Sequence, residues 1–469
     1  MFDKHTYSSR RASLREKLES GLLLFLGNGE SSMNYKDNWY PFRQDSTFLY
    51  FTGLDKPDLA LLIDVDNEKE ILFGNDLTVD DLVWHGRQKT IAEQAHLSGI
   101  QNVQPLASLQ ATIKQLAANR TVHFLPPYRP EHTLQLNELL GLAPSAVKAS
   151  ASVPLIKAIV GLRSYKSEEE ISEIEKAVTV TTQMQATAMQ FAREGMTEAE
   201  LAGRLQGIAI SAGGNLAFPT ILTVHGEILH NHYGTNLLKK GDMVLCDCGA
   251  ETGLHYAGDL TRTFPVNETF STLQKEVYDI VLDAQTAAIE ALAPGTLFKD
   301  VHLLACEKLV EGLKRIGLMK GDAREAVQAG AHTLFFQCGL GHMLGLDVHD
   351  MENLGEEYVG YTEDLKKSTE FGLRSLRLGR ELEDGFVVTV EPGLYFIPEL
   401  IDLWTAEKKH AQFINYPAVQ AFKTFGGIRI EDDLLITANG SRVLGNPLNK
   451  TADSVESARL QKGELAFTA

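Results

Sequence analysis

Acidic side chains stand inside or directly after apolar, strand-like runs at three places in the second half of this chain. Asp247 lies within VLCDCG, Glu391 follows VVTV, and Glu431 follows GIRI. Strands disfavour acidic residues, and a carboxylate inside one needs a cation or several hydrogen-bond donors as partners. Any fold of this chain must therefore supply partners for these carboxylates.

Two further motifs contain residue types that bind metals. Asp259 lies in YAGDLTRTF, and a hairpin would bring it next to Asp247. His342 and His349 lie in the glycine-rich stretch CGLGHMLGLDVHD, where small residues let the backbone approach a site closely. Taken alone, each aspartate is more often a turn residue or half of an ion pair, and a lone histidine is usually structural.

As a set, these residues have a different meaning. Two Asp, one His and two Glu offer oxygen-rich ligands with one nitrogen, a set that suits Mn, Fe, Co or Zn at paired sites. Four carboxylates neutralise two divalent ions. Spacing alone does not show that the five side chains converge; they are Asp247, Asp259, His342, Glu391 and Glu431.

The length of 469 residues predicts two domains, because a single hydrophobic core rarely serves so long a chain. We place them at residues 1–155 and 156–469. In the first, apolar runs at 21–27, 59–65 and 69–75 alternate with helical patterns, which indicates an α/β domain. The last two runs predict a hairpin with a polar turn at 66–68.

The second domain reads as α+β. Ser167 and Thr197 are predicted N-caps of two helices, each followed by acidic residues that suit a helix N-terminus. Strands and turns follow from residue 218 onward, and two more helices are predicted at 271–292 and 298–316.

Several motifs, taken in order, resemble those of one known family. FPTI, GEILH, DCG with GDLTRTFPV, GHMLGLDVHD, TVEPGLY and GIRIEDD are similar to the signatures of the Xaa-Pro aminopeptidase and prolidase family of metallopeptidases. This likeness covers roughly residues 165–450, and FRQDSTFLYFTGL at 42–54 resembles the aminopeptidase P type of N-terminal domain. The resemblance implies an α/β N-terminal domain followed by an α+β pita-bread domain, the creatinase/aminopeptidase-like fold.

The resemblance also assigns roles to residues. Asp259 and Glu431 would bridge two divalent ions, with manganese as the expected metal and cobalt, iron or zinc as alternatives. Asp247 would bind one ion only, and His342 and Glu391 would complete the other. The resemblance thus predicts a dinuclear Xaa-Pro aminopeptidase, which would release the N-terminal residue from peptides with proline at the second position.

Four side chains would serve catalysis. Glu391 would carry a proton to the leaving proline nitrogen, and His349 would stabilise the developing oxyanion. His230 would contact the substrate, although the nearby His232 could exchange roles with it. Arg429 could orient the carboxylate cluster, and an ordinary ion pair is nearly as good an explanation for it.

An Xaa-Pro bond is a tertiary amide without an N–H, so a dedicated pocket is required. Tyr395, His349 and Phe218 are candidates for it by their closeness to the motifs. Two stretches, 351–384 and 396–425, are longer than the short aminopeptidase P pattern and are expected to form substrate lids or oligomer contacts.

Three alternatives stay open. Prolidase, which cleaves only dipeptides, would use the same ligands as the aminopeptidase. A metal-free binding module of the same fold belongs to a different class of protein. A metal-free enzyme that hydrolyses creatine is a third possibility. The presence of ligand-type residues at all five positions disfavours the last two.

The remaining expectations concern surroundings and partners. A formal net charge of -18 argues against nucleic acid. Four cysteines are too few for a disulfide framework, and the polar N-terminus has no apolar signal segment, so a cytoplasmic protein with no membrane contact is expected. Cys246 and Cys248 should point away from Asp247 and pack in the core. By resemblance the chain forms a homodimer or homotetramer.

Overall fold

The computed structural model describes residues 1–461. The chain forms two compact units, of which the first holds Met1–Arg163 together with Met351–Tyr358. The second holds Ser164–Asp350 and the chain from Val359 onward. The sequence places the domain boundary after residue 155, inside helix α8 (Val153–Arg163), whereas contacts assign all of α8 to the first unit.

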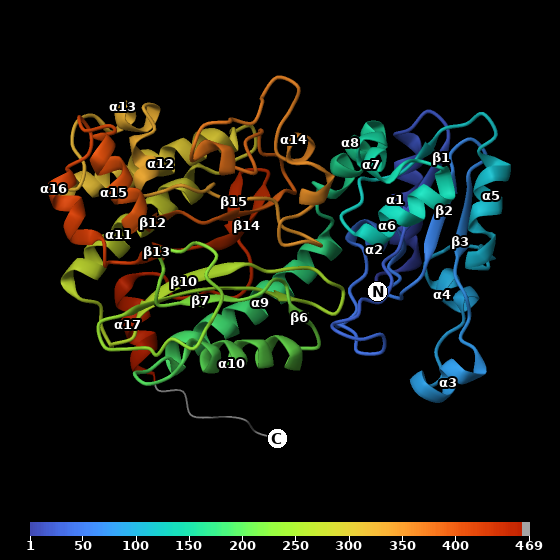
Figure 1. Cartoon of the computed structure of the whole chain (residues 1–469), viewed down its shortest axis with the longest axis horizontal. Helices are drawn as coiled ribbons and strands as arrows, with labels where there is room; N and C mark the ends of the chain where they lie inside the picture. The colour runs from blue at the N-terminus through green and yellow to red at the C-terminus, as the bar shows by residue number, and fades with distance from the viewer. Residues whose placement is uncertain (462–469) are drawn as a thin grey trace. The chain divides into compact units, whose positions relative to one another are not determined.

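The first unit is built on a five-stranded mixed sheet with the order β4-β3-β2-β1-β5 (Figure 1). Strands β2 and β3 pair antiparallel as the predicted hairpin, while β1 and β3 pair parallel with β5 and β4. Strand bounds are β1 Leu22–Leu26, β2 Ala60–Asp64, β3 Lys69–Phe73, β4 Asn102–Gln104 and β5 Val122–His123. The α/β prediction for this region is therefore confirmed.

Helices accompany this sheet along the chain. Their bounds are α1 Lys4–Glu16, α2 Ser46–Thr52, α3 Val79–His85, α4 Ile91–Leu97, α5 Leu109–Leu116, α6 Pro130–Leu140 and α7 Pro144–Val147. Two arginines of this unit pair with acids: the buried Arg11 donates to Glu70 at 2.8 Å, and Arg120 pairs with Asp64 and Asp66.

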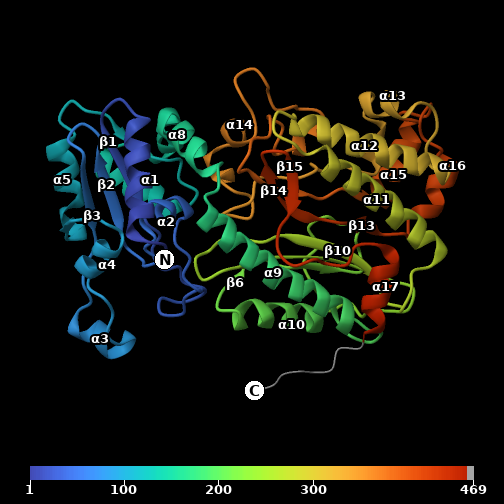
Figure 2. The ribbon, with the colours of Figure 1, turned by 180° about the vertical axis from the view of Figure 1, so that it is seen from behind.

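The longest helices of the second unit are α9, α10, α11 and α12 (Figure 2). Capping boxes start the first two, Ser167 with Glu170 and Thr197 with Glu200, as the sequence predicts for those N-caps. All four predicted helices are present, and their bounds are α9 Glu168–Phe191, α10 Glu198–Ser211, α11 Thr272–Ala291 and α12 Phe298–Arg315.

The strands of the second unit form small antiparallel sheets. The first has the order β10-β8-β7 and packs against α9 and α10, while β11-β14-β15 and the pair β12-β13 pack against α11. Their bounds are β7 Ile221–Thr223, β8 Met243–Cys248, β10 Leu260–Pro265, β11 Val387–Val390, β12 Gly393–Tyr395, β13 Gly427–Arg429, β14 Asp432–Thr437 and β15 Gly440–Val443. A short fourth pairing joins β6 Asn215–Leu216 to β9 Ala250–Glu251.

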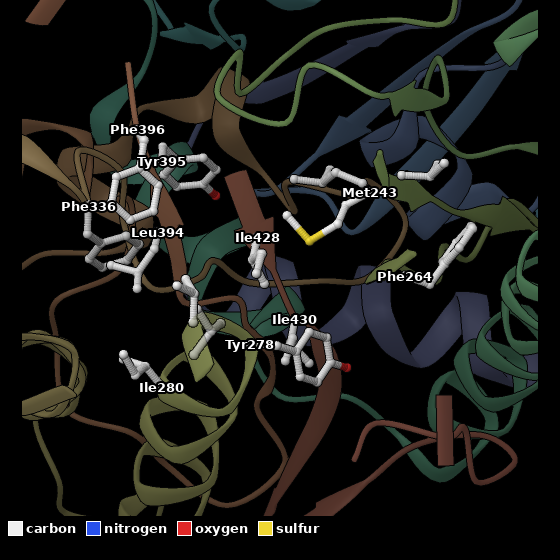
Figure 3. Close-up of a cluster of buried hydrophobic side chains, with 14 of the residues drawn as sticks. Met243, Phe264, Tyr278, Ile280, Phe336, Leu394, Tyr395, Phe396, Ile428 and Ile430 are labelled. Carbon is white, nitrogen blue, oxygen red and sulfur yellow. The ribbon is translucent and has the colours of Figure 1, made fainter. Parts of the chain in front are cut away.

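A continuous apolar core fixes these sheets and helices in place. Figure 3 shows part of it, where side chains of α11, β12 and β13 meet those of β8 and β10. The labelled members are Met243, Phe264, Tyr278, Ile280, Phe336, Leu394, Tyr395, Phe396, Ile428 and Ile430. Cys246 and Cys248 are fully buried in the same cluster, as expected for packing residues.

The two long stretches have different structures. Residues 396–425 form α15 Pro398–Glu407 and α16 Tyr416–Val419, and the stretch packs into the apolar core through Ile401, Trp404 and Val419. Residues 351–384 contain few regular elements, among them α14 Glu356–Val359 and the 3-10 turn η5 Leu373–Ser375. The remaining helices are α13 Ala323–Gln328 and α17 Ala452–Leu460.

Among residues 1–461, no single helix combines the length and the apolar composition that crossing a membrane requires. Two consecutive segments, Pro144–Ser150 and Val153–Arg163, meet that test only when they are taken together, and they are bent by 55°.

Candidate metal centre

One cavity of about 230 Å³ in the second unit is bordered by the side chains that the sequence assigns to metal and substrate. They come from β8, β13, the ends of β11 and β14, and loops between them. The residues are His230, Asp247, Asp259, His342, His349, Glu391, Arg429 and Glu431. The structure thus brings together groups that spacing alone leaves apart.

The two aspartates lie on neighbouring strands. Asp247 is within β8 and Asp259 directly precedes β10, and the antiparallel register places Thr261 opposite Asp247. Asp247 Oδ2 accepts a hydrogen bond from Arg429 Nη2 at 2.6 Å, and the Asp259 N–H donates to Asp433 Oδ2 at 2.8 Å. The Oδ1 atoms of both aspartates are buried and have no hydrogen-bond partner in the described chain.

The two glutamates sit where strands end. Glu431 lies between β13 and β14, where its N–H donates to the Thr261 carbonyl at 3.0 Å and its Oε2 accepts from Thr261 Oγ1 at 2.7 Å. Glu391 directly follows β11, and its N–H donates to the Leu340 carbonyl at 2.8 Å. Backbone hydrogen bonds to β10 and to the loop at Leu340 therefore hold both glutamates beside the cavity.

His342 is held in the tautomer that a metal ligand needs. Its Nδ1 lies 3.0 Å from the Met343 carbonyl oxygen, which can only accept, so Nδ1 carries the proton. The Nε2 atom lies 3.5 Å from Asp259 Oδ2 and 3.7 Å from Glu391 Oε1. A histidine ligand commonly donates its other ring N–H to a carbonyl in this way.

The carboxylates carry more negative charge than the surrounding protein neutralises. Burial, followed by repulsion from Asp247 and other acids, raises the pKa of Asp259 well above its usual range. Burial and then repulsion from Asp259 and Glu391 raise the pKa of Glu431 in the same way. Ligand atoms of Asp259, His342 and Glu431 all lie within 4.8 Å of one another. Orphaned aspartate oxygens, an imidazole nitrogen that faces the carboxylates and excess negative charge fit divalent cations.

Arg429 connects the carboxylates to the core. Besides Asp247, its guanidinium donates to the Tyr395 hydroxyl at 2.9 Å through Nη1 and to Thr261 Oγ1 at 3.2 Å through Nε. Tyr395, a candidate for the proline pocket, is fully buried and does not border the cavity, so that expectation is corrected. Its hydroxyl instead positions Arg429.

Histidines and apolar groups border the other side of the cavity. The His349 ring packs edge-on against His342 with centroids 4.4 Å apart, and Phe218 also borders the cavity. Burial, followed by the charge of Arg429, lowers the pKa of His230, which keeps its imidazole neutral near pH 7. His232 borders the cavity as well, so the exchange of roles between these two histidines stays open.

Two cavity residues escape the sequence argument. Ser375 and Arg377 come from the stretch 351–384, which the motifs do not cover. The only sequence signal for this pair is the positive charge of Arg377 in a stretch without helical or strand periodicity. No residue of the stretch 396–425 borders the cavity. Asp433, which holds the Asp259 backbone, is also absent from the predicted set.

Comparisons with known proteins agree with this geometry. Residues 172–438 match the model of metallopeptidase family M24, and residues 7–124 match the aminopeptidase P N-terminal domain. The chain is 30% identical to the Xaa-Pro aminopeptidase of Escherichia coli over 470 residues, which covers 97% of both chains. It is 31% identical to human Xaa-Pro dipeptidase over 96% of this chain and 91% of the relative.

Solved structures give the same picture. Zinc-substituted aminopeptidase P from Escherichia coli, in complex with product, superposes with a TM-score of 0.81 at 28% identity and covers 99% of both chains. The Pseudomonas aeruginosa aminopeptidase PepP has a TM-score of 0.82 at 27% identity. The M24 match spans more than half of the chain, and the converging carboxylates suit divalent metal ions. This chain therefore belongs to metallopeptidase family M24, with an aminopeptidase P N-terminal domain and a pita-bread catalytic domain.

Proposed function

We propose that this chain is an Xaa-Pro aminopeptidase, which releases the residue in front of proline from the N-terminus of peptides. The observation that carries the proposal is the convergence of four carboxylates and one imidazole on a cavity that also holds His230 and His349. Similarity to aminopeptidase P along both units supports this specificity over a general peptidase.

In this proposal, five side chains would hold two divalent ions: Asp247, Asp259, His342, Glu391 and Glu431. When bound, the ions supply positive charge that makes hydroxide available near neutral pH and polarises the scissile carbonyl. Raised carboxyl pKa values fit this role, because cations relieve the repulsion among buried acids.

The other groups act on the substrate. A Glu391 carboxylate oxygen takes a proton from the attacking water and passes it to the proline nitrogen, which must be protonated to leave. His349 donates a hydrogen bond from its ring N–H to the carbonyl oxygen as negative charge develops there. The neutral imidazole of His230 offers a second N–H. Arg429 holds Asp247 in place through its 2.6 Å hydrogen bond.

Prolidase activity is the second candidate, and Arg377 favours it. This guanidinium borders the cavity, where it could pair with the free carboxylate at the end of an Xaa-Pro dipeptide. In a longer peptide that carboxylate is replaced by an amide. An Arg377→Met substitution should then raise KM for Ala-Pro and leave KM for Ala-Pro-Ala nearly unchanged.

The deciding experiment measures hydrolysis of Ala-Pro beside Ala-Pro-Ala by metal-stripped protein, before and after addition of Mn²⁺. Cleavage of both substrates identifies an aminopeptidase, and cleavage of the dipeptide alone identifies a prolidase. The Asp259→Ala variant is the control and should be inactive with either substrate. If the reloaded wild-type protein cuts neither substrate, a binding module of the same fold replaces the catalytic proposal.

We also propose Mn²⁺ as the native metal. The oxygen-rich ligand set with a single imidazole supports a hard cation of this kind, although Co²⁺, Fe²⁺ and Zn²⁺ accept the same ligands. Reloading stripped protein with each ion in turn and comparing kcat/KM tests this choice. Higher kcat/KM with another ion at equal occupancy would replace manganese in the proposal.

A homodimer or homotetramer is proposed as the working form. Helix α3 supports it, because Val79, Val83 and Trp84 are 77%, 75% and 82% exposed, an apolar group rarely left open on a monomer. Light scattering should give a multiple of the chain mass that falls for Trp84→Ser. The control is Leu134→Ser, an exposed leucine on α6 whose substitution should leave the mass unchanged.

The cytoplasm is the proposed location. All four cysteines are free thiols, which suits a reducing compartment. Fractionation of cells that make a tagged chain tests this, and recovery of the tag outside the cytoplasmic fraction would refute it.

A further inference from the structure

A second cluster of ligand-type side chains lies in the second unit, apart from the carboxylate cavity. His302 and Cys306 are one turn apart on α12, so they share one face of that helix. His332 joins them from the 3-10 turn η3 (Ala331–Leu334). One ligand atom from each residue lies within 4.8 Å of the other two.

All three side chains are buried, and two nitrogens have no partner. His302, Cys306 and His332 are only 1%, 0% and 3% exposed. The Nδ1 atoms of both histidines lack a hydrogen bond to any residue of the described chain. Burial lowers the pKa of His302 to about 3 and that of His332 to about 4, so both imidazoles are neutral. Neutral imidazole is the form that binds metals.

The geometry also matches a metal site. Bonds of about 2.0–2.1 Å from zinc to nitrogen and about 2.3 Å to sulfur, at a tetrahedral angle, separate the two ligand atoms by roughly 3.5 Å. His302 Nε2 lies 3.5 Å from Cys306 Sγ. This distance is also that of a weak contact between thiol and imidazole, so the approach of a third ligand-type side chain, His332, decides between the two.

One residue of this cluster borders a large cavity. His332 borders a cavity of about 790 Å³, whose rim includes the acids Asp300 and Glu307 and the bases Lys299 and Arg324. An ion can reach His332 through this space, and a water molecule from it can occupy a fourth position.

We propose that His302, Cys306 and His332 form a zinc site with one open position, separate from the carboxylate centre. The thiol of Cys306 loses its proton to solvent as zinc binds, which gives a thiolate and two neutral imidazoles as ligands. The ion joins α12 to η3. The carbonyl of Phe335, directly after η3, accepts the Tyr395 N–H at 2.8 Å, so the site stabilises the segment that supports Arg429.

Cobalt substitution tests the proposal with a readout independent of peptidase activity. The full chain, with its carboxylate centre loaded with Mn²⁺, is titrated with Co²⁺, and the near-ultraviolet spectrum is recorded. A thiolate ligand gives an intense charge-transfer band, which oxygen and imidazole ligands do not give. We expect this band in the wild-type protein and one extra zinc per chain by elemental analysis after zinc replaces cobalt.

Two variants remove ligands. Cys306→Ser should abolish the band, and His332→Asn should weaken cobalt and zinc binding at this site by at least about a hundredfold. If one variant fails to fold, as judged by circular dichroism and melting, the other still decides the outcome.

Two matched controls should keep the band. Cys338→Ser removes the thiol that borders the carboxylate cavity, and His410→Asn removes an imidazole that borders the larger cavity near His332. A band that survives in Cys306→Ser, or that disappears in Cys338→Ser, would overturn the proposal. Absence of any band in the wild-type protein would reduce the cluster to a metal-free packing contact.

Discussion

Glu431 and Asp432 are neighbours in the chain and are both buried, yet their surroundings differ. Asp432 accepts hydrogen bonds from Arg262 Nη2 at 2.6 Å, Lys450 Nζ at 2.8 Å and Gln285 Nε2 at 3.1 Å. Although burial alone would raise the pKa of Asp432, Arg262 and Lys450 lower it to about 2. Burial and neighbouring acids raise the pKa of Glu431 instead.

The difference shows that two adjacent acids at the start of β14 have different roles. Asp432 forms ion pairs within the protein, and Glu431 faces the cavity. Successive side chains of a strand point to opposite faces, so adjacent acids enter different environments. On the face of Asp432, the protein supplies the cations itself. On the face of Glu431, four carboxylates border one cavity together with the guanidinium groups of Arg377 and Arg429. The unbalanced charge on this face is what makes it suitable for external cations.

The largest effect should come from removing a carboxylate on the cavity face. We expect Asp259→Asn to lower kcat/KM by at least about a thousandfold, because it removes a ligand-type oxygen and one negative charge. Metal content measured on the same sample should fall in parallel. The matched change Asp432→Asn should leave metal content intact. Loss of metal in both variants would contradict the separation of the two faces.

The next effect is on folding rather than catalysis. Arg262→Met leaves Asp432 buried with less positive charge nearby, which should lower the free energy of unfolding by about 3–5 kcal/mol. Urea denaturation of the metal-loaded protein measures the change. Lys450→Met provides the comparison, because the Lys450 side chain is 30% exposed and its loss should cost only about 1 kcal/mol. Equal costs would refute the dominance of Arg262.

Arg429→Lys tests a residue that positions the cavity carboxylate of Asp247 without being a predicted metal ligand. Lysine keeps the positive charge but cannot bond Asp247, Tyr395 and Thr261 at once, as the guanidinium does. We expect kcat/KM to fall about tenfold to a hundredfold with metal content nearly unchanged. If Arg429 were only a charge-balancing partner, the variant would retain full activity.

A smaller effect should appear in the dependence of stability on pH. The folded pKa of Asp432, about 2, lies below its ordinary value of 3.8. Its contribution is therefore present above pH 3.8 and is lost as pH falls toward 2. The shift is equivalent to about 2 kcal/mol. Acid unfolding of wild-type protein beside Asp432→Asn measures this term, and parallel stability curves across that range would contradict it.

Sequence reasoning succeeded where acids interrupt apolar runs. Asp247 and Glu391 are conspicuous in the sequence because strands disfavour acidic residues. The pairing of β8 with β10 bears out the expected approach of Asp247 and Asp259. In GIRIEDD, three acids follow one another, and alternation alone cannot say which face is the cavity. The position of Arg262, far away in the sequence, decides that question.

Residues without a pattern could not be predicted. Arg377 lies in an irregular stretch, where neither periodicity nor turn chemistry indicates its direction. His302 and Cys306 have helical spacing in the sequence, but their third partner, His332, comes from a different element. Contacts between segments far apart in the chain position these side chains, and local sequence patterns do not indicate such contacts.

The dispersal of the five ligand-type residues along the chain has a kinetic consequence. They lie between residues 247 and 431 on segments that meet only once distant strands have paired. An unfolded chain therefore offers metal ions no assembled site, and contacts between such distant segments form slowly. We therefore expect ions to bind after the chain has folded, and thus to slow unfolding while leaving the refolding rate nearly unchanged.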